Sequence, residues 1–240
     1  MRINTILFDL DGTLVPMDSE KFTETYFKSL NSYIYGYLGD ANFVKNMLTA
    51  VNKMYKDKDE STTLMQKFVK YFNEISAIKY DIFKRYVEDY YAKEFDRLSV
   101  HMEKDNLIKM IVGMIKEKGY KLILASTPLL PQKAMEVRLK WSGLDKKDFD
   151  FIAHIDNMHY IKPSLEFFKE ILAVNDISQE ECIMIGNDVD EDILPASQLG
   201  ISTYYLDEHG VNKSGLKVEC PSGSYIQLYD WVKALPSVKD

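Results

Sequence analysis

Two aspartates, Asp9 and Asp11, follow an apolar run near the start of the chain, and Gly12 comes directly after them. Because the side chains of a strand alternate between its two faces, both carboxylates can point in the same direction. Two carboxylates held together repel, and each raises the pKa of the other unless a cation or a shared proton neutralises them. The pair therefore indicates a site that binds a cation, holds a proton or does both.

Further polar side chains follow the later apolar runs of the chain. Ser126 and Thr127 come after one such run, Lys162 stands just before a predicted helix, and an acidic cluster spans Asp188 to Asp192. In a parallel α/β sheet, the groups that follow the strands converge at one edge. Oxygen ligands of this kind suit Mg²⁺, while the lysine and the hydroxyls suit a phosphate. A cation at this edge would also explain why two aspartates lie together.

The elements that must position these groups can be predicted from the apolar pattern. Residues 3–8 form one strand, and residues 18–98 show helical periodicity almost throughout, as in Leu64, Phe68 and Phe72. After that stretch the pattern alternates between helix and strand. We expect strands at 120–125, 149–155, 182–186 and 201–206, helices at 104–118, 131–141, 163–173, 193–199 and 225–235, and a loop at 209–224.

This alternation of strands and helices predicts βαβ units and a mainly parallel sheet. The first strand has no partner nearby, so it must join the later sheet, and the long helical stretch is then an insertion. We predict an α/β protein with a Rossmann-like parallel sheet, helices on both faces and an inserted all-α domain. The many tyrosines of the insertion are interpreted as lining its helical core, with a few left open as pocket residues.

Composition narrows the classes of function. The 240 residues include 37 acidic and 30 basic side chains, and no basic tract is long enough to follow a nucleic-acid backbone. No apolar run reaches the length of a membrane span, and the first five residues lead straight into a strand. Cys182 and Cys220 are too few for a disulfide framework. We therefore expect a cytoplasmic protein without nucleic-acid or membrane partners.

The ordered set of motifs resembles the haloacid dehalogenase superfamily, whose hydrolases carry four short motifs in this chain order. The segments that carry the resemblance are residues 9–14 (DLDGTL), 124–128 (LASTP), 162–163 (KP) and 186–192 (GNDVDED). Two positions depart from the family pattern: Thr127 stands where asparagine is usual, and Asn187 interrupts the usual Gly-Asp pair. Asp188 is therefore expected to be the first metal ligand of the fourth motif.

The resemblance implies a catalytic core formed by residues 1–16 and 97–240 and a helical cap domain formed by residues 17–96. The insertion stands between the first and second motifs, which is similar to the position of the family's first type of cap. The gap between Ser126 and Lys162 is too short for a second cap.

The resemblance also implies roles for the acidic residues. Asp9 would be the nucleophile that forms an aspartyl-phosphate, and Asp11 would be first the general acid and then the general base. Asp9, the backbone carbonyl of Asp11 and Asp188 would hold Mg²⁺. Asp192 would bind the metal through water or steady Lys162.

The remaining site residues would act on the phosphoryl group. Ser126 would donate a hydrogen bond to a phosphoryl oxygen, and Lys162 would neutralise the charge that develops on the group. Gly12 and Thr127 would lie beside the bound phosphate. The function implied is a Mg²⁺-dependent phosphatase of a small phosphorylated metabolite. The identity of this metabolite and the oligomeric state of the enzyme stay open.

Several alternatives stay open beside this function. A phosphosugar mutase uses the same two aspartates, and a catalytically inactive binding or regulatory protein can share the fold. A phosphonate hydrolase would need a cap lysine, and nothing singles out one of Lys21, Lys28, Lys45 and Lys53. Asp11 argues against a dehalogenase, and a Ca²⁺-binding loop is the weaker interpretation of the first motif.

Overall fold

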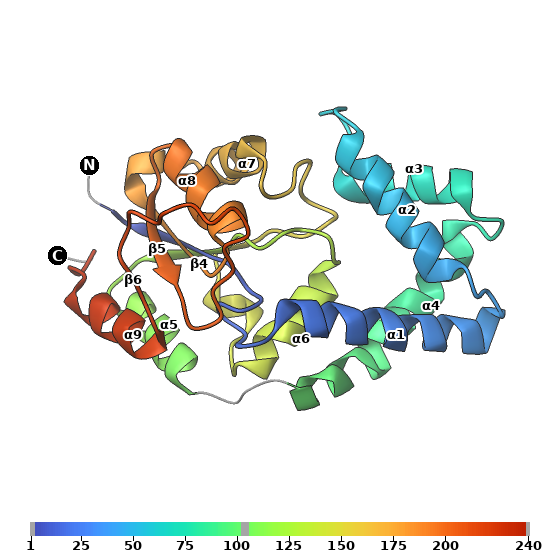
Figure 1. The fold of residues 1–240 in the computed structure, drawn as a ribbon, viewed down its shortest axis with the longest axis horizontal. Coiled ribbons are helices and arrows are strands. Elements are labelled where there is room, and N and C mark those ends of the chain that lie inside the picture. Colours follow the sequence, from blue (N-terminus) through green and yellow to red (C-terminus); the bar gives the residue numbers. More distant parts are fainter. Residues whose placement is uncertain (1–2, 102–105, 239–240) are drawn as a thin grey trace.

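The computed structural model describes residues 3–101 and 106–238, which form a sheet-based core and a group of helices beside it (Figure 1). The core is a parallel sheet with helices on both faces, and the helical group is inserted after the first strand. This arrangement confirms the predicted α/β class with an inserted all-α unit.

The sheet has six parallel strands in the order β3-β2-β1-β4-β5-β6. β1 lies inside the sheet, where Phe8 is in register with Leu124 of β2 and Ile185 of β4. Strands buried on both faces read as continuous apolar runs, which explains the sequence of β1. The strand bounds are β1 (Thr5–Phe8), β2 (Lys121–Leu124), β3 (Phe151–Ile152), β4 (Cys182–Gly186), β5 (Ser202–Leu206) and β6 (Ser222–Gly223).

Helices cover both faces of this sheet (Figure 1). On one face α5 (Leu107–Glu117) packs against α9 (Tyr225–Ala234), and on the other α7 (Leu165–Asn175) packs against α8 (Leu194–Gln198). The helix α6 (Gln132–Trp141) follows β2. β1 and β4 are neighbours although most of the chain separates them, so a crevice forms where their carboxyl ends meet.

The insertion consists of four α-helices and one 3-10 segment, packed around an aromatic core. Phe43, Phe72 and Phe83 are almost fully buried and lie within 6 Å of one another, ring centre to ring centre. Tyr26 and Tyr91 are also buried and share a hydrogen bond of 2.6 Å between their hydroxyls. The elements are α1 (Ser19–Leu38), α2 (Phe43–Lys56), α3 (Leu64–Ile75), α4 (Tyr80–Lys93) and η1 (Phe95–His101).

The start of α3 is bonded directly to the core. The backbone N–H of Leu64 donates to the carbonyl of Met158 at 2.8 Å, and that of Met65 donates to Ile155 at 2.9 Å. The first N–H groups of a helix have no partner within the helix, so these core carbonyls satisfy them. The core loop between β3 and α7 therefore touches the helical insertion at a point away from the chain connections.

The predicted strand bounds were wrong in two places. The third strand is Phe151–Ile152 alone, because it lies at the sheet edge and pairs only with β2. A short strand, Ser222–Gly223, occupies the segment predicted to be a loop and pairs with β5. Gly and Ser carry no strand signal, so sequence pattern could not find it.

Two predicted helices also start elsewhere. α7 begins at Leu165, because Ser164 caps it by accepting from the N–H of Glu166, so Pro163 stands before the helix rather than in its first turn. α8 is preceded by a π-helical turn, Val189–Ile193, which sequence periodicity does not distinguish from an α-helix. The predicted start of the helix at Lys104 lies outside the described residues.

No helix in the described ranges combines the length and the apolar character that crossing a membrane requires.

Candidate active site

Asp9 and Asp11 lie at the carboxyl end of β1, in a tight backbone turn. The N–H of Asp9 still donates to the carbonyl of Ile185 in β4, while Gly12 donates to the carbonyl of Val15 and completes the turn. Gly12 has φ of 81°, a conformation that side chains with a Cβ rarely adopt. A Cβ there would also lie 2.3 Å from the amide nitrogen of Asn187. The turn therefore requires glycine, and it leaves Asp9 and Asp11 at the carboxyl ends of the strands.

Lys162 joins two of the predicted carboxylates. Its Nζ donates to Oδ1 of Asp9 at 2.9 Å and to Oδ1 of Asp192 at 2.5 Å. The side chains of Lys162 and Asp192 are each only 1% exposed, so both charges depend on this network for compensation. Burial lowers the pKa of Lys162, but the charges of Asp192 and Asp9 outweigh it and raise that pKa overall. Lys162 is therefore a cation at the floor of the site.

The residues after β4 divide between structural and site-facing positions. Asp192 also accepts from the backbone N–H of Asp188 at 3.0 Å, which ties the turn to Lys162. Asp188 caps the turn through its Oδ1. Asn187 is buried and accepts from the hydroxyl of Thr13 at 3.1 Å, while its amide donates to the carbonyl of His209 at 2.7 Å. Asn187 thus fastens the β1 turn to the β4 turn.

The two remaining acidic residues of the fourth motif, Asp190 and Glu191, have separate environments. Asp190 accepts from the backbone N–H groups of Lys213 and Ser214, so it holds the loop after β5. Glu191 accepts from the hydroxyl of Thr127 at 3.1 Å and faces the site. Thr127, predicted to lie beside the phosphate, therefore contacts an acidic side chain of the fourth motif.

Sequence reasoning missed one charged residue of the site, Arg138 of α6. Arg138 is buried, and its Nη1 donates to Oδ2 of Asp11. Its Nη2 lies 2.8 Å from the sulfur of Met135. Arg138 comes four residues after the buried Ala134, so the spacing of an arginine on an apolar helix face was the available signal.

The pKa of Asp11 is raised, which suits a residue that must carry a proton. Burial is the main cause, Arg138 opposes it, and the neighbouring charge of Asp9 adds to it. The ion pair with Arg138 fixes one oxygen of Asp11, and its other oxygen, Oδ1, is buried without a partner among the described atoms. Asp11 thus presents one free oxygen at the edge where Asp9 stands.

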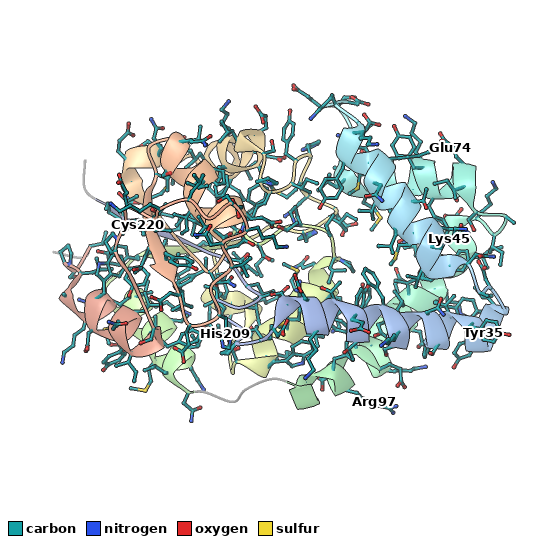
Figure 2. All side chains as sticks on the ribbon, in the orientation of Figure 1. Tyr35, Lys45, Glu74, Arg97, His209 and Cys220 are labelled. Atoms are coloured by element: carbon teal, nitrogen blue, oxygen red, sulfur yellow. The ribbon has the colours of Figure 1, made fainter. Side chains whose placement is uncertain are left out.

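A cavity of about 900 Å³ opens above these residues, between the core and the insertion. Asp9, Asp11, Ser126, Thr127, Asp188 and Asp192 line it from the core side, so the structure brings six of the predicted site residues to one space. Lys162 reaches the same place through its contacts with Asp9 and Asp192. Figure 2 labels His209, another lining residue, beside the start of α1, whereas Tyr35, Lys45 and Glu74 lie at the far end of the insertion.

The donors at this edge fit a Mg²⁺ ion. Among the described residues, no three His, Cys, Asp or Glu side chains form a cluster that could hold a metal by themselves. Mg²⁺ usually takes only one or two protein carboxylates and completes its shell with water and phosphate oxygens. Asp9 and Asp188 both line the cavity, and the partnerless buried oxygen of Asp11 is a polar atom that a hydrated cation would satisfy.

Gly186, the last residue of β4, offers a test of how closely this floor is packed. A Cβ at this position would lie 2.2 Å from Oδ2 of Asp192, and Lys162 holds that side chain in place. We expect Gly186→Ala to lower the free energy of unfolding by about 1–3 kcal/mol and to reduce kcat. Thermal unfolding and turnover measure both effects, with Gly36→Ala, where a Cβ would meet nothing within 4 Å, as the control. Unchanged turnover in Gly186→Ala would show that Asp192 can move freely.

Comparison with known proteins gives consistent matches. A family model described as haloacid dehalogenase-like hydrolase matches residues 6–206. The pyrophosphatase PpaX of Bacillus mycoides is 28% identical over 203 residues, which cover 85% of this chain and 83% of that protein.

Two solved structures share the fold with a TM-score of 0.60 each. One is a HAD phosphatase from Thermococcus onnurineus, 18% identical, with 98% of this chain and 100% of that chain covered. The other is CbbY from Rhodobacter sphaeroides in complex with phosphate, 20% identical, with 94% of this chain and 96% of that chain covered.

Proposed function

Because this chain belongs to the haloacid dehalogenase-like hydrolase family, we propose that it is a Mg²⁺-dependent phosphatase that cleaves a small phosphorylated metabolite. The observation that carries this proposal is the network of Asp9, Lys162 and Asp192 at the floor of the cavity, with Asp11 beside it. A nucleophile, a proton carrier and a buried cation are the three groups that phosphoryl transfer by an aspartate requires.

Asp9 is the nucleophile of the proposed reaction. A carboxylate oxygen of Asp9 attacks phosphorus, a bond from Asp9 to phosphorus forms, and the bond from phosphorus to the ester oxygen breaks. Asp11, whose pKa is raised, gives its proton to the leaving oxygen. Water then attacks the aspartyl-phosphate, Asp11 takes up a proton from it, and free phosphate leaves with Asp9 restored.

The remaining groups stabilise the charge on the transferring phosphoryl group. Lys162 is already fixed beside Asp9 and needs no rearrangement when charge develops. Ser126 is buried at the cavity wall, where its hydroxyl can donate to a phosphoryl oxygen. Mg²⁺, when held by Asp9, Asp188 and the backbone carbonyl of Asp11, would neutralise phosphoryl oxygens as a Lewis acid.

We further infer that residues 17–96 act as a cap domain over this cavity. Support comes from α1 and α2, which contribute Phe22, Thr23, Phe27 and Tyr55 to the cavity lining. A lid of this kind excludes water from the reacting groups and sets which substrates fit.

Removal of Mg²⁺ tests the proposed function. Phosphate release from a panel of phosphate esters and pyrophosphate is measured with Mg²⁺ and with a chelator. We expect the chelator to reduce release by roughly a hundredfold or more, since a Lewis-acid metal supplies several kcal/mol of transition-state stabilisation. Restored release on adding Mg²⁺ serves as the control for irreversible damage. Release that is indifferent to the metal would contradict the proposal, and isomerised sugar phosphates without free phosphate would indicate a mutase.

A further inference from the structure

The walls of the cavity differ in character from its floor. Above Asp9 and Lys162 the lining is largely apolar and aromatic. Phe22, Tyr26 and Phe27 come from α1, Tyr55 comes from α2, and Leu129 and Leu130 come from the loop after β2. A phosphoryl group bound at the floor would therefore place its ester substituent against aromatic rings of the insertion. The part of the substrate that leaves must offer surface that packs on such rings.

Among the described residues that line the cavity, only two are lysine or arginine, and neither offers a buried, uncommitted cation. Arg138 is buried and committed to Asp11. Lys213 is largely exposed and lies 3.9 Å from a carboxylate oxygen of Glu20. A diphosphate, or a phosphate ester that also carries a carboxylate, would thus find only the water-screened charge of Lys213 for its second negative charge.

Acidic side chains extend from the floor towards the insertion. Asp18, Glu20 and Glu24 of the α1 end line the cavity, but they are exposed to water and therefore screened. Glu191 is different, because it is half-buried and only the hydroxyl of Thr127 is bonded to it. Burial raises the pKa of Tyr55 to about 12, and the charge of Glu191 adds to this effect. Glu191 from the core and Tyr55 from the insertion thus line the same cavity, and the charge of the carboxylate acts on the tyrosine.

We propose that this cavity selects phosphate monoesters whose leaving group carries no second negative charge and prefers those that end in an ammonium group. The proposal rests on the phosphatase function proposed above. Aromatic rings attract a cation through their faces, and an unpaired carboxylate attracts it through charge. The specificity-determining residues are Glu191 from the core and Tyr55 from α2. Pyrophosphate, by this reasoning, is a poor substrate of this enzyme.

Three phosphate esters of similar length distinguish the effect of the leaving group's charge from the effect of its shape. Choline phosphate ends in a trimethylammonium group, 3,3-dimethylbutyl phosphate replaces its nitrogen with carbon, and 3-phosphooxypropanoate ends in a carboxylate. We expect kcat/KM to fall in this order, by roughly tenfold at each step for a partly screened charge. The dissociation constants measured by calorimetry without Mg²⁺ should rise in the same order, from choline phosphate to 3-phosphooxypropanoate. Equal values for all three esters, or a preference for the carboxylate, would overturn the inference.

Glu191→Gln tests which residue carries the selection. Glutamine keeps an oxygen that can accept from Thr127 and removes the charge, so the ratio of choline phosphate to 3-phosphooxypropanoate should fall about tenfold. The ratio is the readout because any general loss of activity cancels from it. Glu180→Gln, an exposed position in the core away from the cavity lining, is the matched control and should keep the wild-type ratio. An unchanged ratio in Glu191→Gln would also overturn the inference.

The two proposals fail in different ways. If no ester releases phosphate, the phosphatase function fails, while the order of the dissociation constants still decides the charge preference. If all esters release phosphate at similar rates and bind equally, the phosphatase function stands and the charge preference is wrong.

Discussion

An Asp9→Asn enzyme is expected to release phosphate roughly 10⁴-fold more slowly than the wild type, or not measurably. The amide is not a nucleophile towards phosphorus, and no other carboxylate stands in the same place. Asp192 is committed to Lys162 and to the backbone of Asp188, and Asp11 is held by Arg138. The fold should persist, because Lys162 keeps Asp192 as its partner.

The measurement is single-turnover phosphate release, joined to mass spectrometry of the acid-quenched enzyme. The peptide that contains Asp9 should carry a phosphoryl group in the wild type and not in Asp9→Asn. Asp40→Asn is a matched control, because Asp40 lies in the insertion and only accepts from the backbone of Asn42, which asparagine can also do. Substantial turnover by folded Asp9→Asn enzyme would remove Asp9 from the role of nucleophile.

Lys162→Met is expected to have the largest effect on stability. Methionine fills a similar volume but leaves Asp9 and Asp192 as buried carboxylates without a cation. Breaking a buried ion pair in this way costs about 3–5 kcal/mol, well above the effect of most substitutions. The chemical denaturation of both proteins, measured without Mg²⁺, should therefore show a much lower unfolding midpoint for the variant.

The loss of stability in Lys162→Met should depend on pH. Burial raises the pKa of Asp192, and the positive charge of Lys162 is the largest influence that lowers it. Replacing Lys162 with methionine therefore raises the pKa of Asp192 further. A carboxyl with a folded pKa above its unfolded value of about 3.9 binds more protons in the native state. The stabilisation that this extra proton gives is full below the unfolded pKa and is lost as the pH rises through the folded pKa. Because the pKa of Asp192 is already raised to about 7 in the wild type, the variant should become progressively less stable than the wild type as the pH rises above about 7.

Lys67→Met is the matched control for this pH dependence. Lys67 is also buried, but its Nζ donates to the backbone carbonyls of Asp57 and His159, at 3.3 and 3.5 Å, rather than to buried carboxylates. Its replacement leaves no pair of charged groups behind, so its loss of stability should vary little over the same pH range. If both variants respond alike to pH, the Asp9–Lys162–Asp192 network does not hold its charges as the structure indicates.

Much of the fold could be predicted because its signals are local. β1 and β4 are buried on both faces, so their apolar runs identify them, and the helical insertion follows from its regular spacing. The edges of the sheet were harder to predict. β6 consists of a serine and a glycine, and its pairing with β5 depends on the path of a long loop rather than on its own residues.

The candidate site shows the same limit. Asp9, Asp11 and Lys162 stand at strand ends or motif positions that topology brings together, so their convergence could be anticipated. Arg138 was harder to identify, because an arginine in a helix normally faces water and its spacing on an apolar face does not show that it meets Asp11. Asp190 and Glu191 are neighbours with different partners, and only the π-helical turn decides which of them faces the cavity.

The contact between α3 and the core loop restricts how the insertion can move. A rigid body joined at two points can swing about the line through them, and the chain itself joins the insertion to the core twice. The hydrogen bonds of Leu64 and Met65 add a third point of attachment. A swing of the insertion about that line would have to break both bonds together, so it would be a discrete step rather than a gradual drift. Because backbone N–H groups donate these bonds, proline is the replacement that removes a donor directly at either residue.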